Sequence, residues 1–444
     1  MKVKLSAAAI LTLVLACCML GLQADQPAEA ATSNSRTKAK NVIFMIPDGF
    51  SPAYAANYRL YKGEPSVMDS MIVGMVRTYS ADSALTDSAA AATALATGYK
   101  TNNGMIGRTP DGIERKTILE AAREQGKATG IVATSSITDA TPAAFSSHVF
   151  SRKDESDIAQ QQLQNADVLL GGGRAFFLPE TMGGKQSSRN LLEEAKQRGY
   201  RVVENRTQLE LARGNQILGL FADGDMAPEL DREHTNEPSL KEMTGKAIDI
   251  LRGDKGGFFL LVEGSQIDSA GHYNDAAWAM KDTESFEEAV ELARKFAEED
   301  GNTLVVVVGD HDTGGMSVGG YDQTDANLEV LRQVQASGLY MTKELKKDRS
   351  NVKQVLKDYA GIDVTAEEET AIINAADAMQ AINHVISKRS LVGWNTYLHT
   401  GVDVPLYAFG PGSELFRGLH NNTDLPHLVA RIMNIDFGED KYKK

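Results

Sequence analysis

The chain has 444 residues, of which 42% are hydrophobic and 24% are charged, a composition typical of a globular protein with a sizeable core. Its formal net charge of -14 argues against a nucleic-acid partner, because contacts to a phosphate backbone need basic patches. Any phosphate site in so acidic a chain must be made locally positive, and metal ions are one way to achieve that.

The first 30 residues have the pattern of an export signal. Two lysines precede an apolar run over residues 5–22, and the small residues of 28–30 (AEA) supply a cleavage site. We therefore predict an exported protein (secreted, cell-envelope or periplasmic) with a signal peptide over 1–30 and a flexible lead over 31–40. No later apolar stretch comes near spanning length, so we expect no stable membrane span after cleavage.

Two other interpretations of this segment stay open. The apolar run just reaches the length of a membrane anchor, and Cys17 could be an attachment point for lipid. Both cysteines of the chain, Cys17 and Cys18, lie in this segment, so a cleaved chain would have no thiol and no disulfide. Thiolate zinc sites are then excluded, and metal ligands must be His, Asp, Glu or hydroxyl groups.

Short apolar runs alternate with helical patterns in the rest of the chain. The runs cover residues 41–49, 127–136, 166–173, 257–265, 302–312 and 404–412, and helical patterns cover 117–126, 191–199 and 283–300. This alternation predicts an α/β fold with a large, mostly parallel central sheet flanked by helices on both faces. We expect one domain over 41–444, with the polar, helical stretch of about 321–397 as a cap-like insertion.

Several of the apolar runs end in side chains that bind hard cations. These side chains are Asp48, Asp139 (slightly displaced), Glu263 with Asp268, and Asp310 with His311. Ligands in open α/β sheets bind beyond the carboxyl ends of the strands, so the fold would bring these groups to one edge of the sheet.

Histidines complete two of these groups. Asp268 and His272 are four residues apart, which places both side chains on one face of a helix. His311 follows Asp310 directly, and His399 precedes the run at 404–412. Each pair alone is a weak signal. Together they predict a metal site, since zinc takes His nitrogen and carboxylate oxygen and magnesium takes oxygen ligands.

The stretch LTDSAAAATALATGYK (85–100) predicts a closely packed helix of small residues that begins near Ser88. Ser88 can be interpreted as the N-cap of this helix and also as a nucleophile. The backbone N–H groups and the dipole at a helix N-terminus favour a bound phosphate, so the two interpretations are compatible.

Five separated motifs show a family resemblance. They are DSAAAATALATG, DATPAAFSSHVFSRK, VEGSQIDSAGH, GDHDTGG and HTG, in this order. Over about residues 41–430 the chain resembles the alkaline phosphatases, and the resemblance is weakest in the cap. It implies the α/β fold of that family and the activity of a metal-dependent enzyme that hydrolyses phosphate monoesters to an alcohol and inorganic phosphate.

The resemblance also implies roles for single residues. It assigns Ser88 as the phosphorylated nucleophile and Arg152 as the side chain that grips the substrate phosphate, with Asp87 orienting Arg152 or capping the helix. It implies two Zn²⁺ and one Mg²⁺. The implied ligands are Asp268, His272 and His399 for one zinc, Asp48, Asp310 and His311 for the other, and Asp48, Thr141 and Glu263 for magnesium, with Asp139 near its water shell.

The resemblance further suggests a homodimer. One position departs from the family pattern, because Ser269 follows Asp268 where some relatives carry Lys or His.

Other functions remain as alternatives. A phosphodiesterase of the same superfamily would share the ligands, whereas a sulfatase would need a C/S-x-P-x-R motif that is absent around Ser88. A Ser-His-Asp esterase is disfavoured because Ser88 does not lie in a G-x-S-x-G sequence. An exported protein that binds phosphate or metal without catalysis would keep the ligands but would not need Ser88.

Overall fold

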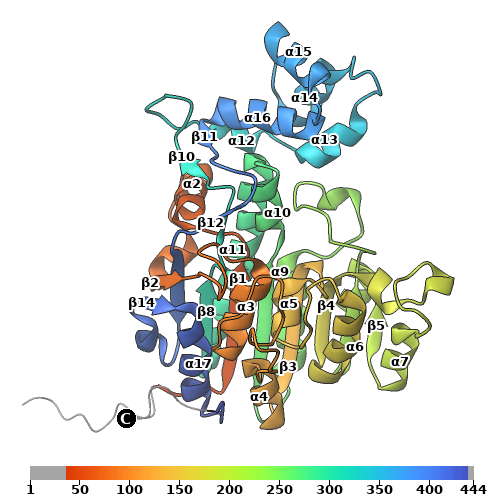
Figure 1. Ribbon diagram of the computed structural model, residues 1–444, viewed down its shortest axis with the longest axis vertical. Helices are drawn as coiled ribbons and strands as arrows, with labels where there is room; N and C mark the ends of the chain where they lie inside the picture. Colours follow the sequence, from red (N-terminus) through yellow and green to blue (C-terminus); the bar gives the residue numbers. More distant parts are fainter. Residues whose placement is uncertain (1–36, 439–444) are drawn as a thin grey trace, which may run out of the picture. The chain divides into compact units, whose positions relative to one another are not determined.

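A ten-stranded sheet organises the described part of the chain (Figure 1), which a computed structural model covers over residues 37–438. The predicted signal peptide and most of the predicted lead lie outside the described residues. Across the sheet the strands follow the order β14-β2-β13-β8-β1-β7-β3-β4-β6-β5. They are β1 (Asn41–Pro47), β2 (Ile72–Arg77), β3 (Ala128–Ser136), β4 (Val168–Gly172), β5 (Arg201–Val203), β6 (Ile217–Leu220), β7 (Phe258–Gly264), β8 (Thr303–Val308), β13 (Val404–Phe409) and β14 (Gly418–Asn421).

The sheet is mostly parallel, as the sequence predicts. Strand β1 pairs in parallel with β7 and β8, and the pairs on either side continue in the same direction. Strand β13 runs antiparallel to its neighbours β2 and β8. The chain enters β13 from the edge where β8 ends, so β13 must run back along the sheet.

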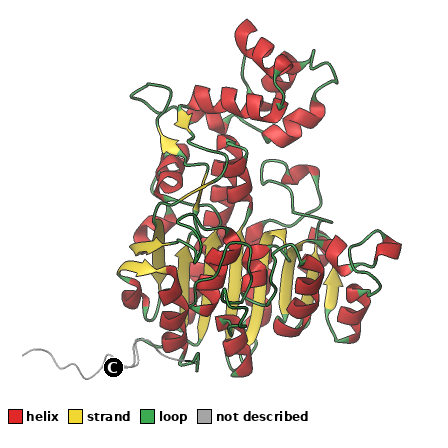
Figure 2. Cartoon of the chain, in the orientation of Figure 1, coloured by secondary structure: helices red, strands yellow, loops and turns green. Residues whose placement is uncertain are grey.

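Helices cover both faces of the sheet (Figure 2), and side chains of alternating residues face each layer. In β8, Val305 and Val307 pack in one core and Val306 and Val308 in the other, all fully buried. Burying each such side chain contributes about 1.5–3 kcal/mol relative to exposure. One core includes α2 (Pro52–Lys62), α8 (Arg206–Leu211), α9 (Leu240–Leu251) and α11 (Ala276–Asp300), and the other includes α3 (Ser88–Thr97), α4 (Ile118–Glu124), α6 (Glu155–Asn165), α7 (Leu191–Gln197) and α17 (Leu425–Met433).

Two short helices and two small sheets lie near the carboxyl ends of the strands. The helices are α5 (Ala140–Ala144) and α10 (Gln266–His272). In one small sheet β9 (Asp312–Thr313) pairs with β12 (His399–Thr400), and in the other β10 (Ser317–Val318) pairs with β11 (Val392–Gly393). The β9–β12 pair fixes His399 beside the segment that follows β8.

The chain between β10 and β11 forms five helices and overlaps the segment predicted as a cap. They are α12 (Glu329–Arg332), α13 (Gly338–Glu344), α14 (Val352–Ala360), α15 (Ala366–Asn374) and α16 (Ala378–Ser390). Figure 1 shows them on the side of the sheet where α10 lies. The backbone N–H of Gly338 donates to the buried carboxylate of Asp275 at 2.8 Å, which ties α13 to the start of α11. Among the described helices, none is both long and apolar enough to cross a membrane.

Candidate active site

The central strands of the sheet bring the predicted ligands together. Asp48 directly follows β1, and Glu263 lies near the end of β7, opposite Ile46 of β1 in the parallel register. Asp310 follows β8 on the other side of β1. Because three adjacent parallel strands end at the same edge, side chains that are far apart in the sequence meet there.

The first ligand group consists of Asp268, His272 and His399, whose ligand atoms all lie within 4.8 Å of one another. The Nε2 atom of His272 lies 3.3 Å from Asp268 Oδ2, and the Nε2 atom of His399 lies 3.6 Å from Asp268 Oδ1. The two Nε2 atoms are 3.1 Å apart. The spacing of four residues in α10 places Asp268 and His272 on one face, as predicted.

Backbone carbonyls determine which ring nitrogen carries the proton in this group. His272 Nδ1 lies 2.7 Å from the carbonyl oxygen of Tyr397, and His399 Nδ1 lies 2.8 Å from that of Thr86. A carbonyl oxygen only accepts, so each Nδ1 is the donor and a neutral ring presents the lone pair of Nε2 to Asp268. Orientation of ligand histidines by such partners is common in metal sites.

The second group consists of Asp48, Asp310 and His311, all buried, with ligand atoms again within 4.8 Å of one another. His311 Nε2 lies 3.1 Å from Asp310 Oδ2 and 3.6 Å from Asp48 Oδ1. The Thr313 hydroxyl donates to Asp268, so it accepts from His311 Nδ1 at 3.2 Å. His311 therefore also directs the lone pair of Nε2 toward carboxylate oxygens.

Burial and like charge disfavour anionic carboxylates here unless a cation is present. Burial, followed by the charges of Asp310 and Asp268, raises the pKa of Asp48 well above its ordinary value. Burial raises the pKa of Asp310 to about 7, and burial, followed by His399, lowers the pKa of His311. Asp48 Oδ1 and Asp310 Oδ2 have no hydrogen-bond donor among the described residues. Such unpaired acceptors fit a bound metal ion.

The predicted magnesium ligands adjoin the second group. The Thr141 hydroxyl donates to Asp48 Oδ2 at 3.1 Å, and Glu263 is fully buried with no hydrogen-bond donor to either carboxylate oxygen among the described residues. Burial, followed by the charge of Asp139, raises the pKa of Glu263. Asp139 itself bonds to Arg152 (3.0 Å), so its carboxylate faces the guanidinium.

Ser88 is the first residue of α3 and is 4% exposed. Its Oγ lies 3.2 Å from His311 Nε2, which places it beside the second ligand group. The expectation that Ser88 is the N-cap is wrong. Asp87 is the N-cap, and its Oδ1 accepts from Ala90 N at 2.9 Å. A carboxylate cap leaves the Ser88 hydroxyl free to face the site.

Arg152 lies between two carboxylates. Its Nη2 donates to Asp139 at 3.0 Å, and its Nη1 lies 3.4 Å from Asp87 Oδ2. Burial opposes the charge of Arg152, but these two carboxylates outweigh it and raise the pKa. Burial and the charge of Arg152 oppose protonation of His272, but its bond to Asp268 outweighs them and raises the pKa of His272 to about 9. Burial, followed by His399 and more weakly by Arg152, lowers the pKa of His311, so the guanidinium lies within electrostatic reach of both ligand groups.

Some contacts of the site were not foreseen from the sequence. Thr313 bridges the two ligand groups, and the carbonyls of Thr86 and Tyr397 orient two histidines. Asp312 accepts from the Thr400 hydroxyl at 2.6 Å, which supports the strand that carries His399. The GDHDTGG motif contained a hint of Thr313 and Asp312, whereas the sequence carries no signal for backbone carbonyls.

Comparisons with known proteins agree with this geometry. A family model described as alkaline phosphatase matches residues 39–435. Alkaline phosphatase 4 of Bacillus subtilis (strain 168) is 40% identical over 457 residues, covering 98% of this chain and 97% of that protein. The crystal structure of a cold-active alkaline phosphatase from Shewanella sp. is similar with a TM-score of 0.82 and 34% identity, covering 88% of this chain and 99% of that chain.

A second similar structure contains a metal ion. It is a variant of the alkaline phosphatase from the Antarctic bacterium TAB5 with Mg bound in its M3 site. Its TM-score is 0.69 with 28% identity, over 90% of this chain and 99% of that chain.

Fold and site together define an α/β protein with two groups of residues that could hold metal ions at the carboxyl ends of its strands. The chain belongs to the alkaline phosphatase family. It is a phosphate monoester hydrolase, and the enzymes of this family depend on metal ions.

Proposed function

We propose that the chain hydrolyses phosphate monoesters through a phosphoserine at Ser88, with two zinc ions and one magnesium ion. The observation that carries this proposal is the position of Ser88 Oγ, 3.2 Å from His311 Nε2 at the N-terminus of a helix. Around it lie carboxylate oxygens that have no hydrogen-bond donor among the described residues. A serine hydroxyl is a weak nucleophile unless a base or a metal activates it.

The two His-containing groups suit zinc, and the third group suits magnesium. Each zinc would have three protein ligands, which leaves a position open for substrate or water. The ligands would be Asp268, His272 and His399 at one ion and Asp48, Asp310 and His311 at the other. Magnesium prefers oxygen ligands, which Asp48, Thr141 and Glu263 offer, with Asp139 near its water shell. When bound, these ions would neutralise the acceptors and supply Lewis acidity toward phosphoryl, leaving-group and water oxygens.

The residues of the chain would then carry two in-line steps. In the first, Ser88 Oγ forms a bond to phosphorus while the bond to the leaving alcohol oxygen breaks. In the second, water attacks phosphorus and Ser88 leaves. Two successive inversions predict net retention of configuration at phosphorus. The N-terminus of α3 adds a favourable dipole for the phosphoryl group bound to Ser88.

Arg152 would hold the phosphoryl group during both steps. Two carboxylates fix its planar guanidinium, and such a fork can donate to two non-bridging oxygens at once. Arg152→Ala should lower kcat/KM by about 10–100-fold. Arg152→Lys keeps the charge but loses the fork, so it should recover only part of the activity. A monoesterase activity unchanged in both variants would contradict this role of Arg152.

The geometry argues against a Ser-His-Asp esterase. In such a triad the carboxylate holds the ring nitrogen opposite the serine. Here Ser88 Oγ and the Asp310 carboxylate both face Nε2 of His311, and Nδ1 faces the Thr313 hydroxyl. The carboxylate therefore lies on the same ring nitrogen as the serine, not on the opposite one as a triad requires. A lone pair on Nε2 beside a carboxylate oxygen suits metal ligation better than a triad.

The test is hydrolysis of p-nitrophenyl phosphate against pH, before and after EDTA and after zinc and magnesium are added back. We expect alkaline activity that EDTA abolishes and the metals restore. Ser88→Ala should lower kcat by at least about 10³-fold, by analogy with loss of other catalytic nucleophiles. Zinc and magnesium content should be measured in both proteins. Full activity without metal would overturn the proposal, and turnover by Ser88→Ala with normal metal content would overturn the nucleophile.

We also propose export of the chain and a homodimer as its functional form. The basic start, the apolar run over residues 5–22 and the small residues at 28–30 support export. N-terminal sequencing of the protein recovered outside the cytoplasm should begin near residue 31, and a chain that retains residues 1–30 would contradict cleavage. Sedimentation analysis should give twice the 48.0 kDa of the full chain, less the signal peptides.

A further inference from the structure

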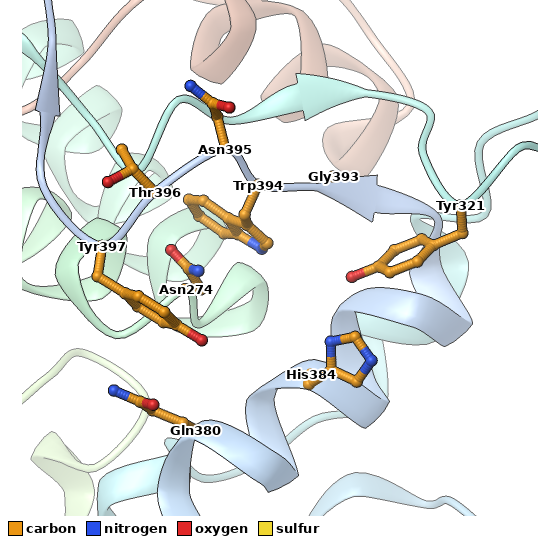
Figure 3. Close-up of a pocket in the computed structure, with 9 residues that line it drawn as sticks. All are labelled: Asn274, Tyr321, Gln380, His384, Gly393, Trp394, Asn395, Thr396 and Tyr397. Carbon is orange, nitrogen blue, oxygen red and sulfur yellow. The ribbon is translucent and has the colours of Figure 1, made fainter.

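A cavity of about 590 Å³ lies between the cap helix α16 and the segment that leads to His399 (Figure 3). Four aromatic or heteroaromatic side chains and three amides make up most of its wall: Tyr321, His384, Trp394 and Tyr397, with Asn274, Gln380 and Asn395. None of the lining residues is Asp, Glu, Lys or Arg. In a chain in which 24% of residues are charged, this uncharged wall favours an uncharged ligand.

The cavity borders the first ligand group. Asn274 is two residues after His272, and Tyr397 is two residues before His399. The Tyr397 carbonyl also accepts from His272 Nδ1 at 2.7 Å. Since two residues of extended chain span about 7 Å, the nearest part of the wall lies within about 7 Å along the chain from His272 and His399. In the function proposed above, the nucleophile Ser88 lies beside the second group, so the first group would face the leaving oxygen on the other side of phosphorus.

Packing fixes part of the wall. The indole N–H of Trp394 donates to Ser387 Oγ at 3.0 Å, and the ring meets Tyr54 edge-on at 6.3 Å between centroids. Asn274 has a left-handed backbone (φ 50°), and its amide nitrogen can donate to the carbonyls of Gly271 (2.9 Å) and Thr396 (3.0 Å). A wall held this way loses little freedom when a ligand binds.

Other groups of the wall are available to a ligand. Among the described residues, no hydrogen-bond partner is found for the hydroxyls of Tyr321 and Tyr397, the Gln380 amide or the His384 ring. Figure 3 shows both hydroxyls pointing into the space between the side chains. Burial, followed by a smaller effect of Tyr397, raises the pKa of Tyr321, so its hydroxyl remains a donor at alkaline pH.

We infer that this cavity is a leaving-group subsite for phosphate monoesters whose alcohol carries a planar aromatic or heteroaromatic ring. The ring would stack on the aromatic wall, and the tyrosine hydroxyls and the Gln380 amide would bond to polar atoms at its edge. Nucleoside monophosphates and aryl phosphates share this chemistry. The inference rests on the proposed function, because the cavity selects among substrates only if the leaving group departs on its side.

The experiment compares kcat/KM of the zinc- and magnesium-loaded enzyme for adenosine 5′-monophosphate, phenyl phosphate and glycerol 2-phosphate. Tyr321→Leu should lower the ratio of each aromatic substrate to glycerol 2-phosphate by about tenfold, since one stacking contact is worth about that much. Gln380→Ala should lower the ratio for the nucleotide and spare phenyl phosphate, because only the base offers polar edge atoms. Gln354→Ala, an exposed amide on cap helix α14, is the matched control and should change neither ratio.

A second readout does not use catalysis. The chain has two tryptophans, so Trp278→Phe leaves Trp394 as the only tryptophan signal. Adenosine should quench this fluorescence to saturation, and more weakly when Gln380→Ala is added. Substrate ratios that stay within about twofold in Tyr321→Leu, or no response to adenosine, would overturn the subsite. If the wild-type enzyme hydrolysed none of the three esters, the proposed function would be overturned instead. Adenosine binding, measured by fluorescence, would then still test the subsite.

Discussion

Asp87 combines two tasks that a substitution can separate. Its Oδ1 caps α3 through Ala90 N (2.9 Å), and its Oδ2 accepts from Gly104 N (2.9 Å) and faces Arg152 Nη1 (3.4 Å). Asp87→Ala removes all three contacts. Asp87→Asn keeps one side-chain oxygen, which can accept from the backbone N–H of either Ala90 or Gly104. The amide NH₂ group then faces the remaining N–H and cannot accept from it.

The contacts give the expected magnitudes. Loss of an N-cap costs about 1 kcal/mol, and an unpaired backbone N–H at Gly104 costs about 1 kcal/mol more. Asp87→Ala should therefore destabilise the protein by about 2 kcal/mol, and Asp87→Asn by about half of that. With an unfolding entropy of about 2.1 cal/mol/K per residue over roughly 400 residues, about 2 kcal/mol corresponds to a fall in Tm of about 2–3 °C.

Thermal unfolding of the metal-loaded proteins measures the first task, and inhibition by inorganic phosphate measures the second. Among the described residues, both variants leave Asp139 as the one carboxylate bonded to Arg152, so phosphate inhibition should weaken by up to about tenfold in each. A Tm for Asp87→Ala equal to that of the wild type would refute the capping argument. Unchanged phosphate inhibition in both variants would refute the orienting argument.

Two further changes test the packing and the electrostatics of the fold. Gly314 has φ +79°, and a Cβ there would lie 2.6 Å from the Trp394 ring, so Gly314→Ala should cost about 2–5 kcal/mol of stability in thermal unfolding. Gly301→Ala, with φ +68° and open space around it, should cost only about 1 kcal/mol, and equal losses would contradict the clash. Burial opposes protonation of His148, but the bond to Glu120 (2.9 Å) outweighs burial and raises the pKa of His148. The charged His148–Glu120 pair therefore stabilises the folded protein fully below about pH 6.5, and this contribution is lost as pH rises through the raised pKa. The difference in Tm between wild type and His148→Gln should therefore be largest near pH 5–6 and shrink toward pH 9; a difference independent of pH would show that the pair is not charged.

Much of the fold could be predicted because the buried strands are short apolar runs with sharp ends. The runs at 41–49 and 302–312 became β1 and β8, and the carboxylates after them lie at one edge of the sheet. Strands β2, β5, β6 and β14 of the large sheet were not predicted; β5 and β6 have only three and four residues, too few for a clear apolar run. β2 (IVGMVR) is only partly buried and β14 has four residues without a buried one, so neither has the pattern of a central strand.

The site was predictable as a set of residues but not as a set of contacts. Asp87 and Ser88 are both favourable N-caps, and the sequence alone does not show which of them occupies that position. The pairing of β9 with β12 involves two residues on each side, too few for any periodic pattern. Backbone carbonyls such as that of Tyr397 orient ligands without any demand on the side chain, so composition and spacing carry no trace of them.

Thr313 connects these contacts into one arrangement of protons. Its single hydroxyl proton goes to Asp268, so it can only accept from His311 Nδ1. Backbone carbonyls require the same Nδ1 proton in His272 and His399. In their neutral forms all three histidines then turn the Nε2 lone pair toward carboxylates, which suits a shared cation. Without a cation, burial opposes protonation of His272 but its bond to Asp268 outweighs burial and raises the pKa to about 9, so a metal ion at this group takes the place of the Nε2 proton. Thr313→Val should therefore disturb both ligand groups at once, because it releases the ring of His311 and leaves Asp268 without its hydroxyl donor.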